Sequence, residues 1–165
     1  MRDFSEIYNL PNVPAVYAFY SGGRGPQHVT YVGTAGKLKP RIMQHLIRRD
    51  SSVTTGTSAA SLNPDYVTNL SWWEHPDFEQ TEKLKAAELV AFEVLNPVLR
   101  SRGAVNRSAL QLHSDKAFYE KIKDLFESSP TGKIKFPSLT DVIGRINQLE
   151  ERIKQLEISL QKLSK

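Results

Sequence analysis

Two short apolar stretches near the start of the chain have the composition of β-strands. Residues 13–20, VPAVYAFY, are rich in β-branched and aromatic side chains, and residues 28–33, HVTYVG, resume this character after a segment rich in Gly and Pro. Such a pair of stretches around a run of turn formers predicts a β-hairpin. A third strand is expected over residues 67–75, VTNLSWWEH.

The segment after the hairpin repeats its apolar residues at helical spacing. Residues 38–49 carry apolar side chains at positions i, i+4 and i+8, which are Leu38, Ile42 and Leu46. Pro40 fits the first turn of this helix, where a missing N–H costs little. Residues 51–61, SSVTTGTSAAS, have neither helical nor alternating periodicity and predict a long surface loop.

Two further helices are expected, over residues 79–95 and 114–126. Asp77 or Thr81 is the candidate N-cap of the first of these helices, because short polar side chains favour that position. The Asn96-Pro97 pair is expected to end it.

The C-terminal segment has the most regular pattern, because its apolar residues alternate spacings of three and four. A heptad repeat places Leu139, Ile146, Ile153 and Leu160 at a, and Val142, Leu149, Leu156 and Leu163 at d. Mainly Ile at a with Leu at d favours a parallel two-stranded coiled coil. Arg145 and Arg152 at g would face Glu150 and Glu157 at e of a partner. The alternative is that this helix folds back on its own domain, but we expect a homodimer through residues 139–163.

Composition and charge indicate the class of protein and the kind of partner to expect. Hydrophobic content of 39%, charged content of 24% and the absence of Cys describe a globular protein without disulfides, and we expect it in the cytoplasm. No apolar run approaches the length of a membrane span, about 20 residues. The net charge is +4, and residues 21–50 hold a block of basic side chains, at Arg24, Lys37, Lys39, Arg41, Arg48 and Arg49. Such a block suits a phosphate-bearing partner, although a solvated helix face would have the same composition.

Three polar residues occupy unusual places in the predicted helices. Arg41 and His45 are four residues apart, so they are neighbours at the edge of the apolar stripe of the first helix. Glu88 falls inside the apolar stripe of the 79–95 helix, where an unpaired carboxylate is expensive to bury. Glu88 therefore needs a cation partner, either a metal ion or a basic side chain such as Arg41, or it lines a cleft.

The hairpin adds Tyr17 and Tyr31, one phenol on each strand. If the hairpin lies beside the first helix, two phenols, a guanidinium, an imidazole and a carboxylate could converge. Hydrolysis of a phosphodiester needs such a set: a base for water, a cation for the developing negative charge, and a hard oxygen ligand for Mg²⁺.

The order and spacing of these residues resemble the GIY-YIG nuclease superfamily. The chain has AVYAFY and YVG in place of the two family motifs, then Arg eight residues after Gly33, His four residues later, and Glu88 nine residues before Pro97. The resemblance covers residues 14–100. It implies a small α/β (α+β) domain with a three-stranded, mostly antiparallel sheet flanked by helices, here followed by the long coiled-coil helix.

The resemblance also implies an activity, which is metal-dependent hydrolysis of DNA phosphodiester bonds by an endonuclease. Tyr17 matches the family's proposed general base, held by His45, and Tyr31 matches the tyrosine that orients water or phosphate. Arg41 matches the arginine that stabilises the phosphorane. Glu88 matches the carboxylate that binds the single divalent ion, Mg²⁺ or Mn²⁺.

The substrate-binding positions implied by the resemblance are less specific. Gly33 would let the backbone approach the substrate, and Lys37 and Lys39 would lie where phosphates pass. The family places Asn three residues after the Pro, where this chain has Arg100. Arg100 could still bind phosphate.

Three functions are consistent with these residues. The first is a dimeric DNA endonuclease, with a nuclease domain over residues 1–108, a helix and linker over 109–137, and a coiled coil over 138–165. The second is a non-catalytic nucleic-acid-binding module with the same fold, which the Arg100 replacement favours. The third is a scaffold protein whose coiled coil recruits partners.

Overall fold

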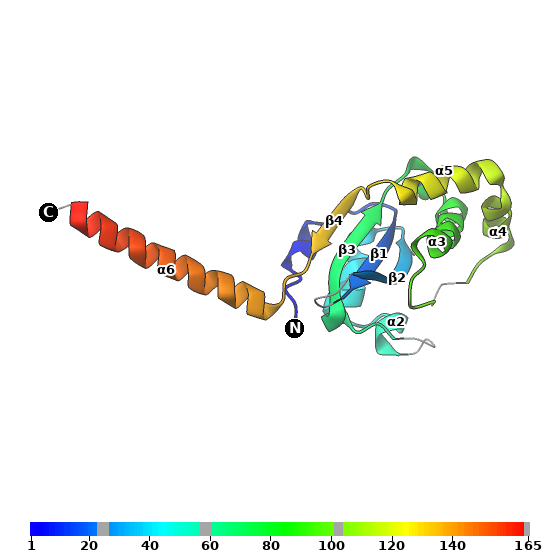
Figure 1. The fold of residues 1–165 in the computed structure, drawn as a ribbon. Helices are drawn as coiled ribbons and strands as arrows, with labels where there is room; N and C mark the ends of the chain where they lie inside the picture. The colour runs from blue at the N-terminus through cyan, green and yellow to red at the C-terminus, as the bar shows by residue number, and fades with distance from the viewer. Residues whose placement is uncertain (23–26, 57–60, 101–103, 164–165) are drawn as a thin grey trace. The chain divides into compact units, whose positions relative to one another are not determined.

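Four strands of the described chain form one antiparallel sheet (Figure 1). The computed structural model describes residues 1–22, 27–56, 61–100 and 104–163. Across the sheet the order of the strands is β2 (His28–Ala35), β1 (Ala15–Ser21), β3 (Val67–Trp73) and β4 (Gly132–Lys135). The expected hairpin and third strand are confirmed, and the chain is a mixed α/β protein.

The prediction of a three-stranded sheet is wrong because it omitted β4. This strand has only four residues, GKIK, and it pairs antiparallel with β3 from Asn69↔Lys135 to Trp72↔Gly132. Two lysines in four residues give no apolar pattern, so the sequence indicated only a linker here. Gly132 is needed at this point because a Cβ there would lie 2.1 Å from the Trp72 ring.

Each face of the sheet is covered by a different set of elements. On one face, Tyr17, Phe19 and Tyr31 pack with the first helix and with the segments that precede β1 and follow β4. On the other face, apolar side chains of β1, β2 and β3 pack against helices α3 and α5 (Figure 1). Alternation along β1 produces the two sets, because successive strand residues point to opposite faces.

The first predicted helix is confirmed and contains an irregularity. It begins as α1 (Leu38–Met43) and continues as a π-helical turn, η2 (Gln44–Arg48), which ends at Arg49 with a left-handed φ of 58°. π-Helical turns occur frequently at functional sites. This turn contains His45.

The prediction of a surface loop over residues 51–61 is wrong for its first part. Residues Ser52–Thr55 form a short helix, α2, and both Ser51 and Val53 are buried. Residues 57–60 lie outside the described chain, as does Arg24 of the basic block. Small hydroxylated residues gave no sign of burial, since their packing depends on contacts distant in the sequence.

The helix that carries Glu88 is α3 (Thr81–Leu95), and Asn96 ends it with a φ of 47°. The expected N-cap is wrong, because the cap position is Gln80 and no side chain caps the helix in the described structure. Asp77 instead lies in the 3₁₀ turn η4 (Pro76–Glu79) and forms ion pairs with Lys83 and Lys121.

Two helices follow α3 along the chain. They are α4 (Arg107–Ser114), which the sequence did not indicate, and α5 (Lys116–Glu127), which matches the expected third helix. The Asn106 side chain caps α4 by accepting from the Ala109 N–H at 2.8 Å, and Asp115 caps α5 by accepting from the Phe118 N–H at 2.8 Å. Two further 3₁₀ turns, η1 (Ser5–Asn9) and η3 (Pro64–Tyr66), complete this part.

The chain divides into two compact units. Residues 4–136 form the unit just described, and residues 1–3 with 137–165 form the second. The second unit contains the long helix α6 (Leu139–Leu163). Ser138 begins this helix with a reciprocal cap, because its Oγ accepts from the Asp141 N–H at 3.1 Å and its own N–H donates to Asp141 Oδ2 at 3.1 Å. Within the described residues, α6 and the other helices all fall short of the length and apolar character needed to cross a membrane.

Candidate active site

Tyr17 and Tyr31 reach the same face of the sheet from neighbouring strands. The register pairs Tyr17 with Gly33 and Phe19 with Tyr31, which places the two phenols diagonally across the β1–β2 pair. The ring centroids are 6.2 Å apart. The Tyr17 side chain is fully buried, and Tyr31 keeps 6% of its surface exposed. The hairpin therefore brings the two predicted phenols together.

Gly33 provides the space for this arrangement. A Cβ at position 33 would lie 2.5 Å from Tyr17 Oη, 2.7 Å from Tyr17 Cζ and 3.0 Å from a carbon of the Tyr31 ring. Any other residue would therefore displace the phenol of Tyr17. Tyr17 fills the space that a side chain at position 33 would need.

His45 lies directly behind the two phenols. It is completely buried, and its Nε2 is 2.6 Å from Tyr17 Oη. Its ring also contacts Tyr31, with 5.6 Å between the ring centroids. Burial, together with the nearby Arg41 cation, lowers the pKa of His45 from 6.5 to about 3. His45 is therefore neutral at physiological pH.

Arg41 supplies the positive charge of the site. Its Nη1 donates to Gln44 Oε1 at 2.7 Å, and its charge acts on Tyr17 and Tyr31. Burial alone lowers the pKa of Arg41, but its interactions with Tyr17 and Tyr31 outweigh this effect and raise the pKa above its usual value. Arg41 is only partly buried, so this cation can be reached from solution.

Both phenols are uncharged at neutral pH. Burial, followed by the proximity of Tyr31, raises the pKa of Tyr17 well above its usual value of 10.0. Burial also raises the pKa of Tyr31, although the Arg41 cation opposes this effect. A neutral phenol can accept one proton while it donates its own to a neighbouring group. It can therefore relay a proton without becoming negatively charged.

Glu88 acts on the same two phenols from α3. Its side chain is 7% exposed, which confirms the burial expected from its place in the apolar stripe. Its negative charge raises the pKa of both Tyr17 and Tyr31. Helix α3 packs on β1 and β2, the strands that carry these tyrosines. Glu88 therefore acts electrostatically on both phenols.

A divalent cation would find one protein ligand here. Among the described residues there is no group of three or more His, Asp or Glu side chains that could hold a metal ion. Mg²⁺ commonly keeps several waters and binds through one or two carboxylates plus substrate phosphates. The Glu88 carboxylate offers a hard oxygen of the kind that this mode uses, on the helix that packs on β1 and β2.

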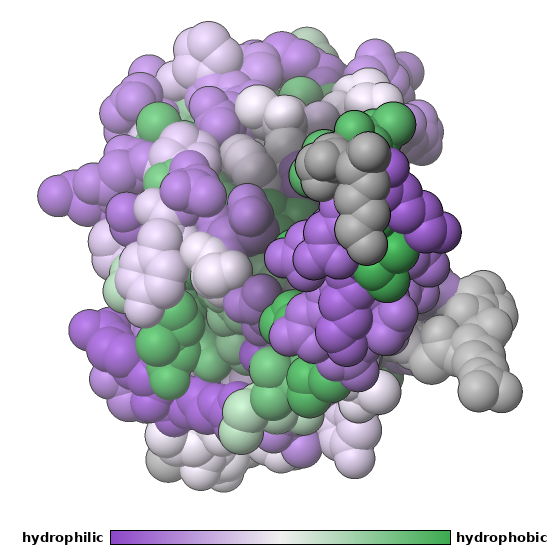
Figure 2. Space-filling view, turned by 90° about the vertical axis from the view of Figure 1, so that its left-hand side faces the viewer, coloured by the Kyte–Doolittle hydropathy of each residue, from purple (hydrophilic) through white to green (hydrophobic). Residues whose placement is uncertain are grey.

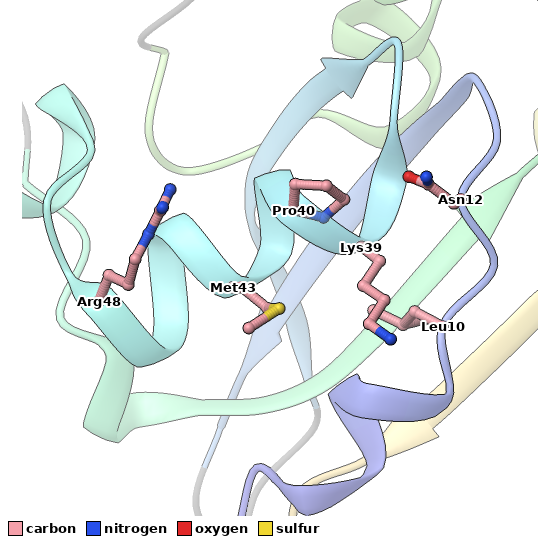
Figure 3. A pocket seen from close by; sticks show the side chains of 6 residues that line it. All are labelled: Leu10, Asn12, Lys39, Pro40, Met43 and Arg48. Carbon is pink, nitrogen blue, oxygen red and sulfur yellow. The ribbon is translucent and has the colours of Figure 1, made fainter.

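Of the two lysines expected to contact phosphate, Lys39 lies in a different place from Arg41. Lys37 is exposed at the cap of α1, and Lys39 lies about 200° around the helix from Arg41. Lys39 Nζ donates to the Tyr8 carbonyl oxygen at 2.7 Å. It lines a separate pocket of about 410 Å³ (Figure 3), with Leu10, Asn12, Pro40, Met43 and Arg48.

Arg100 also occupies a place of its own. It hydrogen-bonds with Asn96 Oδ1, four residues earlier. It lines a pocket of about 370 Å³ beside α3 and α4, with Leu89, Phe92, Glu93, Leu110 and His113. The side chain is exposed, so it remains available to an anionic partner.

Ser51 and Thr54 belong to the site although the sequence did not indicate them. Ser51 Oγ lies 2.7 Å from His45 Nδ1 and 2.8 Å from Thr54 Oγ1. Ser51 is 1% exposed. A serine in a run of Ser and Thr carries no signal of such a role, so only the folded chain reveals it.

Comparison of the chain with known protein families, with curated proteins and with solved structures gives no match. The function of this site is therefore inferred from its own residues.

Proposed function

We propose that the chain is a metal-dependent endonuclease that hydrolyses DNA phosphodiester bonds and dimerises through α6. One observation supports this most strongly. Tyr17, Tyr31, Arg41 and His45 converge on one face of the β1–β2 hairpin, and Glu88 is electrostatically coupled to both phenols.

Arg41 would bind the phosphate. A guanidinium that stays charged and is partly exposed can donate to two phosphate oxygens at once. As water attacks phosphorus, negative charge grows on those oxygens, and a cation already in place stabilises it without reorganisation. Gln44 holds the guanidinium in position through its Oε1.

The phenols would move the proton that the attacking water loses. Tyr31 is the phenol with exposed surface, so it orients the water or the phosphate. Tyr17 accepts the proton of the water while its own proton passes to His45 Nε2, 2.6 Å away. Because the pKa of His45 is about 3, its ring is neutral at physiological pH, and Nε2 lies within hydrogen-bond distance of Tyr17 Oη. The phenols and the imidazole together act as the general base.

Glu88 would hold the divalent ion. Mg²⁺ or Mn²⁺, when bound, withdraws charge from a phosphate oxygen and from the leaving group. The Glu88 carboxylate would contribute one oxygen ligand, the hard donor that such an ion prefers.

The dimer rests on the exposed apolar stripe of α6. None of the residues described in this helix is buried, and its a and d positions are all Leu, Ile or Val. Figure 2 shows hydrophobic residues at the surface of the molecule among hydrophilic ones. Arg145 and Arg152 complement Glu150 and Glu157 of a second copy. Two active sites per dimer suit cleavage of both strands of a duplex.

The test is cleavage of supercoiled plasmid by the full chain with Mg²⁺ or Mn²⁺. Glu88→Gln keeps the size of the side chain but removes its charge, and Glu82→Gln on the exposed start of α3 is the matched control. We expect wild type and Glu82→Gln to nick or linearise the plasmid, and Glu88→Gln to be at least about a hundredfold slower. Absence of cleavage by the wild type with either metal, or equal cleavage by Glu88→Gln, would refute the proposal.

The second candidate is a module that binds nucleic acid without cutting it. The observation that favours it is the complete burial of Tyr17, whose phenol is covered in this structure. It predicts DNA binding that weakens steeply with salt, remains intact in Glu88→Gln, and is accompanied by no cleavage. The same proteins, assayed by DNA binding at two salt concentrations, distinguish the two candidates.

A further inference from the structure

A buried chain of hydroxyl groups continues behind His45. It begins at Ser51 Oγ, 2.7 Å from His45 Nδ1, and continues to Thr54 Oγ1, 2.8 Å further. The Thr54 hydroxyl then donates to the Ser51 carbonyl oxygen at 2.9 Å. Both His45 and Ser51 are buried, so the hydrogen bond between them is shielded from solvent.

The Ser51 hydroxyl contacts His45 and does not cap helix α2, which is the usual role of a serine at this position. Ser51 occupies the cap position of α2, where a serine side chain ordinarily accepts a backbone N–H of the first turn. In the described structure, this hydroxyl makes no such bond. The N–H groups of Thr54 and Thr55 bond instead to the Ser51 carbonyl oxygen, at 3.0 and 2.9 Å.

The hydrogen atoms of this chain can be counted. Thr54 has one hydroxyl hydrogen, which points to the Ser51 carbonyl, so Thr54 Oγ1 accepts the hydrogen of Ser51. Ser51 Oγ must then accept from His45, which places the imidazole hydrogen on Nδ1. His45 Nε2 consequently carries no hydrogen and accepts the O–H of Tyr17.

The opposite order of donors is disfavoured by one contact. If Thr54 donated to Ser51, and Ser51 to His45 Nδ1, the Nε2 hydrogen would point at Tyr17. Thr54 Oγ1 and the Ser51 carbonyl oxygen would then face each other at 2.9 Å with no hydrogen between them. Two acceptor oxygens at that distance repel.

We propose that Ser51, supported by Thr54, is a positioning residue that fixes His45 as the Nδ1–H tautomer, so that Nε2 can take the proton of Tyr17. The tautomer is inferred from the distances among His45, Ser51 and Thr54, and its use in catalysis rests on the proposed function. Ser51 touches neither substrate nor metal in this account. It acts through His45, as the partner of a metal-bound or catalytic histidine commonly does.

The direct test is ¹⁵N NMR of the full chain with labelled histidines, and His45→Gln identifies the His45 signals among those of the four histidines. In the wild type we expect a protonated Nδ1 and an unprotonated Nε2. Ser51→Ala removes the acceptor of the Nδ1 hydrogen, so the tautomer should shift towards Nε2–H. Ser51→Thr keeps a hydroxyl and should retain the wild-type pattern.

A second variant, Thr54→Val, tests the same tautomer in case Ser51→Ala does not fold. Thr54→Val conserves the shape of a residue that is only partly buried, and it frees the Ser51 hydrogen to point at His45. It should therefore shift the tautomer in the same direction. An Nε2–H tautomer in the wild type, or no change in either variant, would overturn the proposal.

Plasmid cleavage adds the catalytic part. We expect Ser51→Ala to lower kcat about 10- to 100-fold while KM for DNA changes by no more than about twofold, and Ser51→Thr to recover most of the rate. A tautomer shift in a protein whose wild type does not cut DNA would uphold the role of Ser51 and refute the proposed function. Cleavage at the wild-type rate by a Ser51→Ala protein with a shifted tautomer would overturn the catalytic use alone.

Discussion

The two units of this chain differ in whether their apolar and polar side chains are buried or exposed. In residues 4–136, the apolar side chains of both sheet faces are covered, and polar groups such as His45 and Ser51 are buried with hydrogen-bond partners. In α6, the apolar side chains are exposed, with Ile153 at 55% and Leu156 at 64%. The first unit buries its apolar side chains within a single chain, whereas α6 carries an exposed apolar stripe.

This difference is the reason for proposing a separate task for each unit. A buried polar network is costly to form unless every member is paired, so its presence in the first unit points to chemistry rather than to stability alone. An exposed apolar stripe with complementary flanking charges points to association. The following substitutions test the comparison, from the largest expected effect to the smallest.

The largest effect is expected from charge in the α6 stripe. Ile153→Asp places a carboxylate at an a position, where it would meet its counterpart in the dimer. Burying two like charges is strongly unfavourable, so we expect a dimer in the wild type and a monomer in this variant at micromolar concentration. Sedimentation velocity of the full chain measures this directly.

The matched control for this variant is Ile158→Asp. Ile158 is also exposed, at 53%, but it lies at heptad position f, outside the stripe. This variant should remain dimeric. A monomeric wild type, or equal masses for the two variants, would contradict the assignment of the stripe.

A smaller effect is expected from crowding the phenol of Tyr17. Gly33→Ala places a methyl group 2.5 Å from Tyr17 Oη, and overpacking of this kind costs about 1–3 kcal/mol. Gly36→Ala is the control, because a Cβ there meets no atom of the described chain within 4 Å. Urea denaturation should show Gly33→Ala to be the less stable of the two. Equal stabilities would mean that Tyr17 is not held where the structure places it.

The smallest effect is expected from pH. The pKa of His45 is about 3 in the folded chain, against a usual value of 6.5, so below pH 6.5 only the unfolded chain takes up this proton. The contribution of His45 to stability is therefore complete above about pH 6.5 and declines towards pH 3, by about 1.4 kcal/mol per pH unit. His45→Gln removes this contribution, so its free energy of unfolding should fall less steeply between pH 6.5 and 5. Identical slopes for both proteins would show that His45 is protonated in the folded chain.

The sequence predicted those features that depend on local periodicity. The hairpin, the helix carrying Arg41 and His45, the α3 helix and the α6 helix all follow from the spacing of apolar residues. The burial of Glu88 followed for the same reason, because its position in the stripe of α3 is a local property.

The features that the sequence did not predict depend on contacts between distant segments. Strand β4 has four residues, and it is a strand only because β3 offers an unpaired edge. Asp77 had the character of an N-cap, but Lys121 binds it from 44 residues away. Ser51 looked like part of a solvated loop, and its role is defined by His45 on the π-helical turn.

The most direct test of the central claim is the single-turnover rate of plasmid cleavage by Tyr17→Phe, which removes one oxygen from the site. Tyr20→Phe is the control, because Tyr20 lies on the same strand but packs on the opposite face of the sheet. If the buried phenol and His45 move the proton of the attacking water, Tyr17→Phe should be about 10²–10⁴-fold slower than wild type at saturating DNA, while Tyr20→Phe is unchanged. Cleavage by Tyr17→Phe at the wild-type rate would contradict the claim.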